Sequence, residues 1–382
     1  MTQLLHTSFQ RGAHALVIGV GEYPWLNGGT QPRFAHFEGM GQLSSPPESA
    51  RAFADWMLSP TGYHNPAYPL ASLDLLIADS STDQFVPPGG ASTTIQRARF
   101  ADINTAILSW FQRGHAHADN LLLFFYCGHG VASGIDMTLL PEDYGSQQTP
   151  PQMSLNLATD FNGFYLGMDS CAAKNQLFFI DACRVASGLL IRTHNFSGNP
   201  VIPGMAQVSS PPRNAPIYYG AVPGISAYGR KGKTSFFTEA LLKAFRGAGA
   251  DDISGTWALQ TVTLHRGIHH HLRRAVANTA AAGQLSMASN VGQPLAFHQL
   301  TGLPECPVDV LCDPESDTAI ANLAVSGNGV QQARVPDAAP WGLNLLLGDY
   351  DFAANITVPL ARAGQIRSRV APPFRSVKIR VK

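Results

Sequence analysis

The sequence predicts an α/β fold in which helices cover both faces of a mainly parallel, six-stranded sheet, followed by a small antiparallel β domain. Over the first three hundred residues, apolar runs of strand length alternate with longer stretches of helical periodicity. The strand-length runs are continuous, as expected for strands that are buried on both faces. Beyond residue 317, apolar and polar residues alternate with period two, which is typical of an antiparallel sheet.

Six segments have the length and composition of strands in the main sheet. The first, "HALVIGVG", is an unbroken apolar run closed by glycine. The runs "NLLLFFY" and "QLFFI" contain paired phenylalanines, which we expect in the core of the sheet. The six predicted strands cover residues 14–21, 73–78, 120–126, 176–180, 216–222 and 293–297.

Four segments between these strands have apolar residues at helical spacing. Residues 48–58, "ESARAFADWML", place four apolar side chains on one helical face. Residues 93–114 place six large apolar side chains at the spacing of a buried helix face. Two further helices are predicted over residues 234–245 and 259–276.

The length of 382 residues favours one large domain and a smaller one. A segment rich in Ser, Pro, Gly and Asn predicts a long exposed loop, which is a natural site of proteolytic nicking. The stretch "LPECPVDVLCDPESD", residues 303–317, is interpreted as a domain boundary. The predicted units are residues 1–302, divided into 1–190, the loop 191–215 and 216–302, and a C-terminal β domain over 303–382.

Charge and composition exclude several classes of protein. The net charge is zero, so the chain has neither the basic footprint of a nucleic-acid-binding protein nor a polybasic membrane patch. The N-terminus lacks the pattern of a signal peptide, and no apolar stretch reaches the ~18 residues of a membrane span. The five cysteines show no CxxC pairing, which favours reduced thiols. We therefore expect a cytoplasmic protein.

Chemically reactive residues follow two of the most hydrophobic strands. The third predicted strand ends at Cys127-Gly128-His129-Gly130, and the fourth ends at Asp181-Ala182-Cys183. Ligands of parallel α/β sheets bind beyond the carboxyl ends of the strands, and neighbouring strands lie ~4.8 Å apart. If these two strands are neighbours, an imidazole and a thiol project into one crevice, as a nucleophile and its proton-transfer partner. The amides of Gly130 and Cys183 are then candidates for an oxyanion hole.

These motifs resemble those of the caspase and metacaspase family of cysteine endopeptidases. The resemblance rests on strands ending in "GHG" and "DACR", on "ALVIGVGEY", "TLLPEDY" and "FFTEALLKAFRG", and on their order between residues 14 and 297. It implies a caspase-like fold with His129 and Cys183 as the catalytic dyad. It also implies an oxyanion hole formed by the amides of Gly130 and Cys183. The short single chain resembles the prokaryotic, metacaspase-like members.

The resemblance also predicts substrate specificity. The family position two residues before the nucleophile lines the S1 pocket, and it is glutamine in the aspartate-specific caspases but aspartate in metacaspases, which accept arginine or lysine. Here it is Asp181, and Glu48 is the best-placed counterpart of a second acidic position. Cys127 stands at a pocket position that is usually serine, and Arg230 stands one position late to match the pocket arginine of caspases. An acidic pocket of this kind predicts cleavage after Arg, with Lys second.

Each assigned residue also has a structural interpretation. Single histidines and cysteines at strand ends are usually structural, and cysteine often serves as a small buried hydrophobe. Asp181 could cap the helix or turn that follows it, and Glu48 could be an ordinary charge at a helix N-terminus. Cys127 could be a redox-active second thiol or only a pocket wall. The paired context of Cys183 and His129 favours catalysis for these two.

The sequence predicts no metal and no organic cofactor, although some metacaspases depend on calcium. The triplet His269-His270-His271 does not indicate zinc, because adjacent histidines on a helix point in different directions; we expect it to be solvent-exposed. Arg192 and Arg213, which bracket the predicted loop, are candidate self-cleavage sites if the enzyme cuts after arginine, and are otherwise solvated.

The functional expectation is a cysteine endopeptidase in which Cys183 attacks the carbonyl, His129 protonates the leaving amine, and water then releases the acyl-enzyme. Its substrates are proteins or peptides, and by analogy it is a regulated protease, or zymogen, of a stress, cell-death or defence pathway. The C-terminal domain would bind an activator protein or a small-molecule signal. The alternative is a catalytically silent caspase-like scaffold that acts through this domain. A serine or zinc hydrolase is disfavoured because GxSxG and HExxH are absent.

Overall fold

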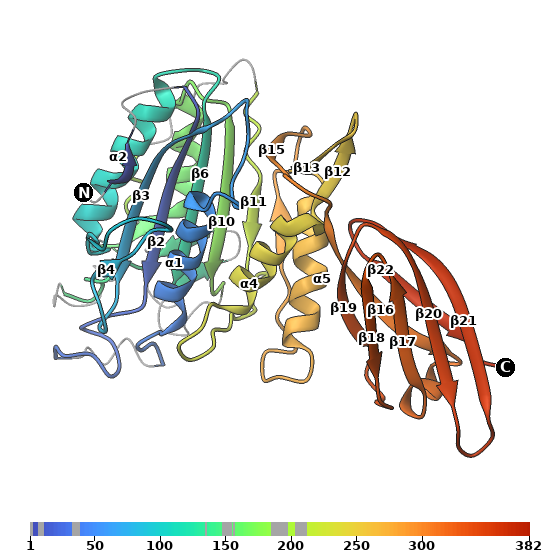
Figure 1. The fold of residues 1–382 in the computed structure, drawn as a ribbon. Helices are drawn as coiled ribbons and strands as arrows, with labels where there is room; N and C mark the ends of the chain where they lie inside the picture. Colours follow the sequence, from blue (N-terminus) through green and yellow to red (C-terminus); the bar gives the residue numbers. More distant parts are fainter. Residues whose placement is uncertain are drawn as a thin grey trace.

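A computed structural model describes residues 3–6, 11–32, 39–133, 136–146, 155, 157–184, 198–202 and 212–382. At its centre is a seven-stranded sheet whose five inner strands are parallel, while the two edge strands are antiparallel to their neighbours (Figure 1). In spatial order its strands are β1 (Gln3–His6), β3 (Leu70–Ala78), β2 (Ala13–Val20), β6 (Leu121–Gly128), β10 (Asn175–Ala182), β11 (Ile217–Tyr219) and β14 (Met287–Ser289).

Helices cover both faces of this sheet, so its inner strands are mostly apolar. Successive strand residues point to opposite faces, so Phe124 and Phe178 enter one core and Phe125 and Phe179 enter the other. The first core is closed by α2 (Phe100–His115) and α3 (Phe161–Gly167), and the second by α1 (Ser45–Leu58), α4 (Phe236–Lys243) and α5 (Leu264–Val276).

Three small sheets surround the main one. They are the pair β4 (Gln84–Phe85) and β5 (Thr93–Thr94), the sheet of β7 (Gly130–Ser133), β8 (Asp136–Leu139) and β9 (Thr159–Asp160), and the sheet of β12 (Ala250–Ile253), β13 (Thr256–Gln260) and β15 (Ala296–Gln299). Short helical turns occur at η2 (Met168–Ser170) and η4 (Ala244–Ala248).

The C-terminal strands form two further sheets around a hydrophobic core of their own, which contains Trp341, Tyr350 and Phe352. This part of the chain lies beside α5 (Figure 1). One sheet has the order β19 (Trp341–Leu346), β16 (Glu305–Asp313), β22 (Arg375–Arg380), and the other β18 (Val330–Arg334), β17 (Asn322–Gly327), β20 (Gly348–Ile356), β21 (Arg362–Val370); η5 (Glu315–Ala319) follows β16.

The predicted α/β class and the added antiparallel sheets are confirmed, but several element predictions differ from the structure. Residues 293–297 do not supply the last strand of the main sheet: β14 does, and β15 pairs with β13 instead. The short β1 adds a seventh strand. Residues 303–317, the predicted domain boundary, contain the nine-residue strand β16, and β16 runs parallel to β22.

Two predicted helices begin later than expected. The helix predicted from residue 93 starts at Phe100, and the helix predicted from residue 259 starts at Leu264. In both cases a short strand, β5 or β13, occupies the first part of the predicted helix. Among the described residues, no helix combines the length and the apolar character needed to cross a membrane.

Candidate active site

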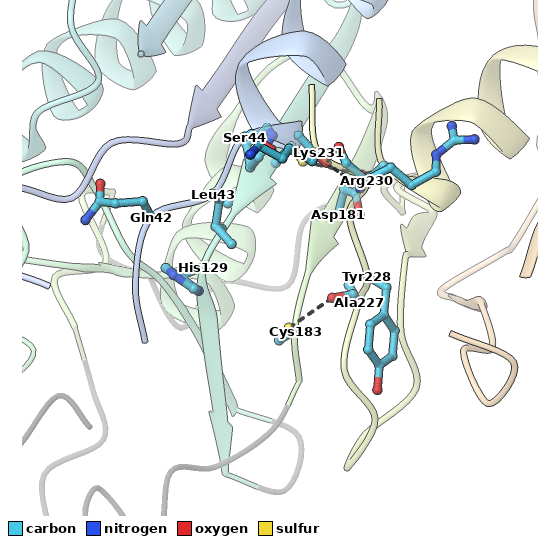
Figure 2. Close-up of a pocket in the computed structure, with 16 residues that line it drawn as sticks. Gln42, Leu43, Ser44, His129, Asp181, Cys183, Ala227, Tyr228, Arg230 and Lys231 are labelled. Carbon is cyan, nitrogen blue, oxygen red and sulfur yellow. Dashed lines mark hydrogen bonds between the residues drawn. The ribbon is translucent and has the colours of Figure 1, made fainter. Parts of the chain in front are cut away.

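The carboxyl ends of β6 and β10 meet at one edge of the sheet. The two strands are adjacent and parallel, and their register pairs Cys127 with Asp181 and Gly128 with Ala182. His129 and Cys183 therefore follow at the same level on neighbouring strands. Both line a cavity of about 260 Å³, where Figure 2 shows them on the two strand ends.

The imidazole of His129 is held in a defined orientation. Its Nε2 lies 2.7 Å from the carbonyl oxygen of Gly41, which can only accept a hydrogen bond, so Nε2 carries the proton. In the neutral ring, Nδ1 is then the unprotonated nitrogen. The backbone N–H of His129 donates to the hydroxyl of Tyr23 at 2.8 Å, and the two rings lie 4.7 Å apart. Tyr23 thus fixes both the backbone and the ring of His129.

The thiol of Cys183 is partly buried and donates to the carbonyl oxygen of Ala227 at 3.4 Å (Figure 2). Burial raises the pKa of the Cys183 thiol above its ordinary value of 9.0 and lowers the pKa of His129 below 6.5. Near pH 7 the free site therefore holds a thiol and a neutral imidazole rather than a thiolate–imidazolium pair.

The backbones of Gly130 and Cys183 approach each other closely. A Cβ added to Gly130 would lie 2.9 Å from the carbonyl oxygen of Cys183, so only glycine fits here. Where the β7–β8 ladder begins, Leu140 donates its N–H to the carbonyl oxygen of His129. Hydrogen-bonded and non-hydrogen-bonded pairs alternate along an antiparallel ladder, so the next pair, Gly130 and Leu139, is a non-hydrogen-bonded one. The Gly130 amide is therefore not used by β8. It lies beside the strand end that carries Cys183.

The base of the cavity is acidic. Asp181 is only 3% exposed, and its Oδ2 accepts hydrogen bonds from the hydroxyls of Ser235 and Thr238 (2.6 Å for Thr238) and from the thiol of Cys127 at 3.4 Å. Ser235 is also the N-cap of α4, where it accepts from the Thr238 amide. Burial raises the pKa of Asp181 above its usual 3.8, and these hydrogen bonds oppose that rise.

The rim of the cavity is formed by residues 227–231 and the start of α1. The hydroxyl of Ser45 accepts from the N–H of Arg230 and donates to its carbonyl oxygen, both at 2.7 Å. The guanidinium of Arg230 pairs with Glu239 on α4 and points away from the cavity (Figure 2). The exposed Lys231 stands at the rim, where solvent screens its charge.

The structure does not bring Glu48 to this cavity. The side chain of Glu48 is 45% exposed and lies 3.8 Å from Arg51, on the side of α1 that carries the Arg51–Asp79 ion pair. From the start of α1 and the residue before it, the cavity is lined by Ser44, Ser45 and Pro46, none of which is charged. Asp181 is thus the single carboxylate among the described residues that line it.

Of the two candidate self-cleavage sites, the structure describes Arg213 alone. Arg213 is not an exposed loop residue, since its side chain is 8% exposed and its guanidinium stacks 4.1 Å from the ring of Tyr165. It also donates to the carbonyl oxygen of Tyr165 and to Gln176. An S1 pocket cannot accept Arg213 unless these contacts break. Arg192 lies outside the described residues.

The histidine triplet on α5 differs from the expectation of solvent exposure. His271 is 5% exposed, and burial lowers its pKa to about 3, while His269 and His270 are half-buried. Within the described part of the chain, no group of three or more His, Cys, Asp or Glu side chains could hold a metal ion. The five cysteines are free, and Cys171 is buried in the core.

Sequence reasoning missed several residues of this site. Tyr23 ends the quoted motif "ALVIGVGEY", so a hydroxyl just after a strand end was the available signal. Ser235 precedes the helical run "FFTEALL", which is a recognisable N-cap pattern, but its contact with Asp181 depends on the packing of α4. Nothing in the sequence marks Gly41 or Ser45 as a site residue. Gly41 acts through its backbone carbonyl, and Ser45 acts through a contact with Arg230, which is distant in the sequence.

The chain is similar to several known proteins. The family model of the caspase domain matches residues 13–290. An uncharacterized protein of Sinorhizobium fredii, y4kE, is 24% identical over 83% of this chain and 95% of its own length. Similar solved structures include caspase-1 from Spodoptera frugiperda (13% identity, TM-score 0.44, 76% of this chain and 92% of the other) and pro-sf-caspase-1 (14%, 0.41, 77% and 93%). Because the family model matches most of the length of this chain, the chain belongs to the caspase family of cysteine peptidases.

Proposed function

We propose that this protein is a cysteine endopeptidase that cleaves protein substrates after arginine, with lysine second, and uses Cys183 as nucleophile and His129 as its proton-transfer partner. The observation that carries the proposal is the shared cavity. A thiol, an imidazole whose Nδ1 is unprotonated, and a buried carboxylate all line a space of about 260 Å³.

The proposed reaction begins with a neutral pair. As the sulfur of Cys183 bonds to the substrate carbonyl carbon, Nδ1 of His129 takes the thiol proton. The carbonyl oxygen gains the negative charge, and we expect the amides of Gly130 and Cys183, whose backbones approach each other closely, to donate hydrogen bonds to it. When the C–N bond breaks, the imidazolium gives its proton to the departing amine.

Water completes the cycle. Neutral His129 removes a proton from a water molecule as its oxygen attacks the thioester carbon. The C–S bond then breaks, the acid product leaves, and the thiolate regains its proton from His129. The hydrogen bond from Nε2 to Gly41 supports this role, because it keeps Nδ1 as the working nitrogen throughout.

The specificity for a cation rests on Asp181. A buried carboxylate at the base of a cavity attracts a guanidinium strongly, because little water screens the interaction. Arginine is favoured over lysine because its planar fork makes paired hydrogen bonds that an ammonium cannot. The guanidinium of Arg230 does not compete, since it pairs with Glu239 outside the cavity.

A panel of fluorogenic peptides tests the proposed function. Peptides that differ only in the residue before the cleaved bond should be hydrolysed in the order Arg, Lys, then Asp. We expect kcat/KM for Arg to exceed that for Asp by about 10³-fold, because a second carboxylate next to Asp181 costs several kcal/mol. Faster turnover of the Asp peptide would refute the specificity. Inactivity towards all three, together with no labelling of Cys183 by an Arg chloromethyl ketone, would favour a silent scaffold.

The protonation states predict how the reactivity of Cys183 depends on pH. Its pKa is raised, so the thiolate of the free enzyme forms only above about pH 9, and alkylation by iodoacetamide should accelerate through that range. The pKa of His129 is lowered, so kcat/KM should hold down to pH 6.5 and fall only below it, where protonation removes the base. Mass spectrometry of Cys183 after timed alkylation measures the pH dependence of thiolate formation. Initial rates of peptide hydrolysis measure the pH dependence of kcat/KM. Alkylation already maximal at pH 7 would instead reveal a thiolate–imidazolium pair.

The domain division and the biological role remain part of the proposal. The separate hydrophobic core of β16 to β22 supports a C-terminal unit over residues 303–382 that binds an activator or signal. Such a unit fits a regulated protease of a stress, cell-death or defence pathway.

A further inference from the structure

A second cavity, of about 780 Å³, lies between α5 and the C-terminal strands, and it shares no lining residue with the cavity of Cys183. One wall is the face of α5 that carries Arg266, His270, Arg273 and Arg274, whose spacing of three and four residues places them together. The opposite wall is formed by Asp309 of β16, Gly342 of β19 and Phe374, just before β22. This volume is in the range of small-ligand sites.

The cavity is basic in a chain whose net charge is zero. Its three arginines face one carboxylate, Asp309, which lies 3.6 Å from Nε of Arg274. Arg266 and Arg273 are exposed, and the described residues give neither of them a salt bridge. Guanidinium groups in this arrangement present paired N–H donors that match phosphate oxygens.

The histidines of the cavity add no positive charge, so its basic character comes from the arginines. Burial and the neighbouring arginines lower the pKa values of His269 and His270, although Asp309 opposes this for His270. With both rings neutral, three guanidiniums and one carboxylate leave a net charge of about +2. Asp309 is the only carboxylate among the described lining residues, so this net charge is not balanced within the cavity. A bound phosphate group would balance it.

A flat aromatic surface adjoins the arginines. The rings of His270 and Phe374 stack at 4.5 Å with an interplanar angle of 13°, and Phe374 is 40% exposed. A large exposed aromatic ring beside charged groups offers a stacking surface for a planar ring that bears an anionic tail.

We propose that this cavity binds a nucleotide, with its phosphates on Arg266, Arg273 and Arg274 and its base against the ring of Phe374. Both walls are already connected, because Arg274 donates to the carbonyl oxygen of Leu343 in β19 at 3.0 Å. A bound nucleotide would add contacts to both walls. Its site adjoins α5, which packs on α4, the helix that supplies Ser235 and Thr238 to Asp181.

Titration calorimetry of the full-length protein with ATP, pyrophosphate and adenosine, in phosphate-free buffer at 0.15 M salt, tests the proposal. We expect saturable binding of one ATP per chain, weaker binding of pyrophosphate, and no measurable binding of adenosine. Arg266→Gln and Arg273→Gln should each weaken ATP binding about 10-fold, and Phe374→Ala should weaken ATP but not pyrophosphate. The matched control is Arg367→Gln, an exposed arginine of β21 outside the cavity, which should leave binding unchanged.

Three results would overturn the proposal. The first is the absence of ATP binding, the second is full affinity in the Arg266 and Arg273 variants, and the third is pyrophosphate binding as tightly as ATP, which would show a simple anion site. None of these outcomes depends on peptidase activity. The Arg266 and Arg273 side chains are exposed, so both variants are expected to fold, which circular dichroism checks.

Discussion

Replacing Cys183 with alanine is expected to reduce hydrolysis of an Arg-terminated peptide by roughly 10⁴-fold or more, to the background rate. No other described thiol can take over the reaction. The thiol of Cys127 is buried and hydrogen-bonded to Asp181, and burial and that carboxylate raise its pKa well above 9.0. Cys171, Cys306 and Cys312 lie in cores away from the cavity. Initial rates with the fluorogenic peptide measure the loss.

Cys306→Ala is the matched control for this variant. It removes a thiol of the same size from a buried position in β16, so it should leave kcat/KM unchanged. Melting curves of both variants separate loss of chemistry from loss of fold. Activity of Cys183→Ala above one hundredth of the wild-type rate would eliminate Cys183 as nucleophile.

Replacing Asp181 with asparagine is expected to lower kcat/KM for the Arg peptide by roughly 10²-fold or more, because it removes the buried charge that faces the substrate cation. The amide is the same size, and its oxygen can still accept from Ser235 and Thr238, so α4 should stay in place. The loss should be specific to charge. The substitution should change kcat/KM little for a peptide with citrulline, which keeps the shape of arginine without its charge. The ratio of kcat/KM for the Arg peptide to kcat/KM for the citrulline peptide, compared between wild type and variant, measures the effect.

Glu48→Gln provides the contrasting variant. It removes one carboxylate from the same part of α1, but the structure turns that side chain towards Arg51 and away from the cavity. We expect kcat/KM for the Arg peptide to change less than twofold. If Glu48→Gln reduced the rate as strongly as Asp181→Asn, the cavity described here would not be the S1 pocket.

Much of the fold was accessible from local pattern. The continuous apolar runs predicted β2, β3, β6, β10 and β11, because a strand covered on both faces needs no polar positions. Short elements were not accessible. Residues 287–289 form β14, but three residues carry too little periodicity to identify a strand, and they pair only because β11 offers an unoccupied edge.

In the candidate site, too, local pattern predicted some features, while others depend on contacts between distant parts of the chain. The sequence predicted Cys183, His129, Asp181 and Cys127 as site residues because each stands at or near the end of an apolar strand, where parallel sheets expose their ligand sites, and all four line one cavity. It did not show that Glu48 lies beside Arg51 or that Arg213 stacks on Tyr165, because helix rotation and the aromatic partner of a buried arginine depend on long-range packing.

By itself, the sequence determined the order of the longer strands and helices, the reactive groups at two strand ends and the family to which the chain belongs, since all of these are written in local runs and motifs. Only the tertiary structure decided that β6 and β10 are neighbours in register, that Ser235 and Thr238 hold Asp181, and that α5 and the C-terminal sheets enclose a basic cavity. Those features join residues tens to more than a hundred positions apart. Their contacts follow from how buried surfaces pack, which no local pattern records.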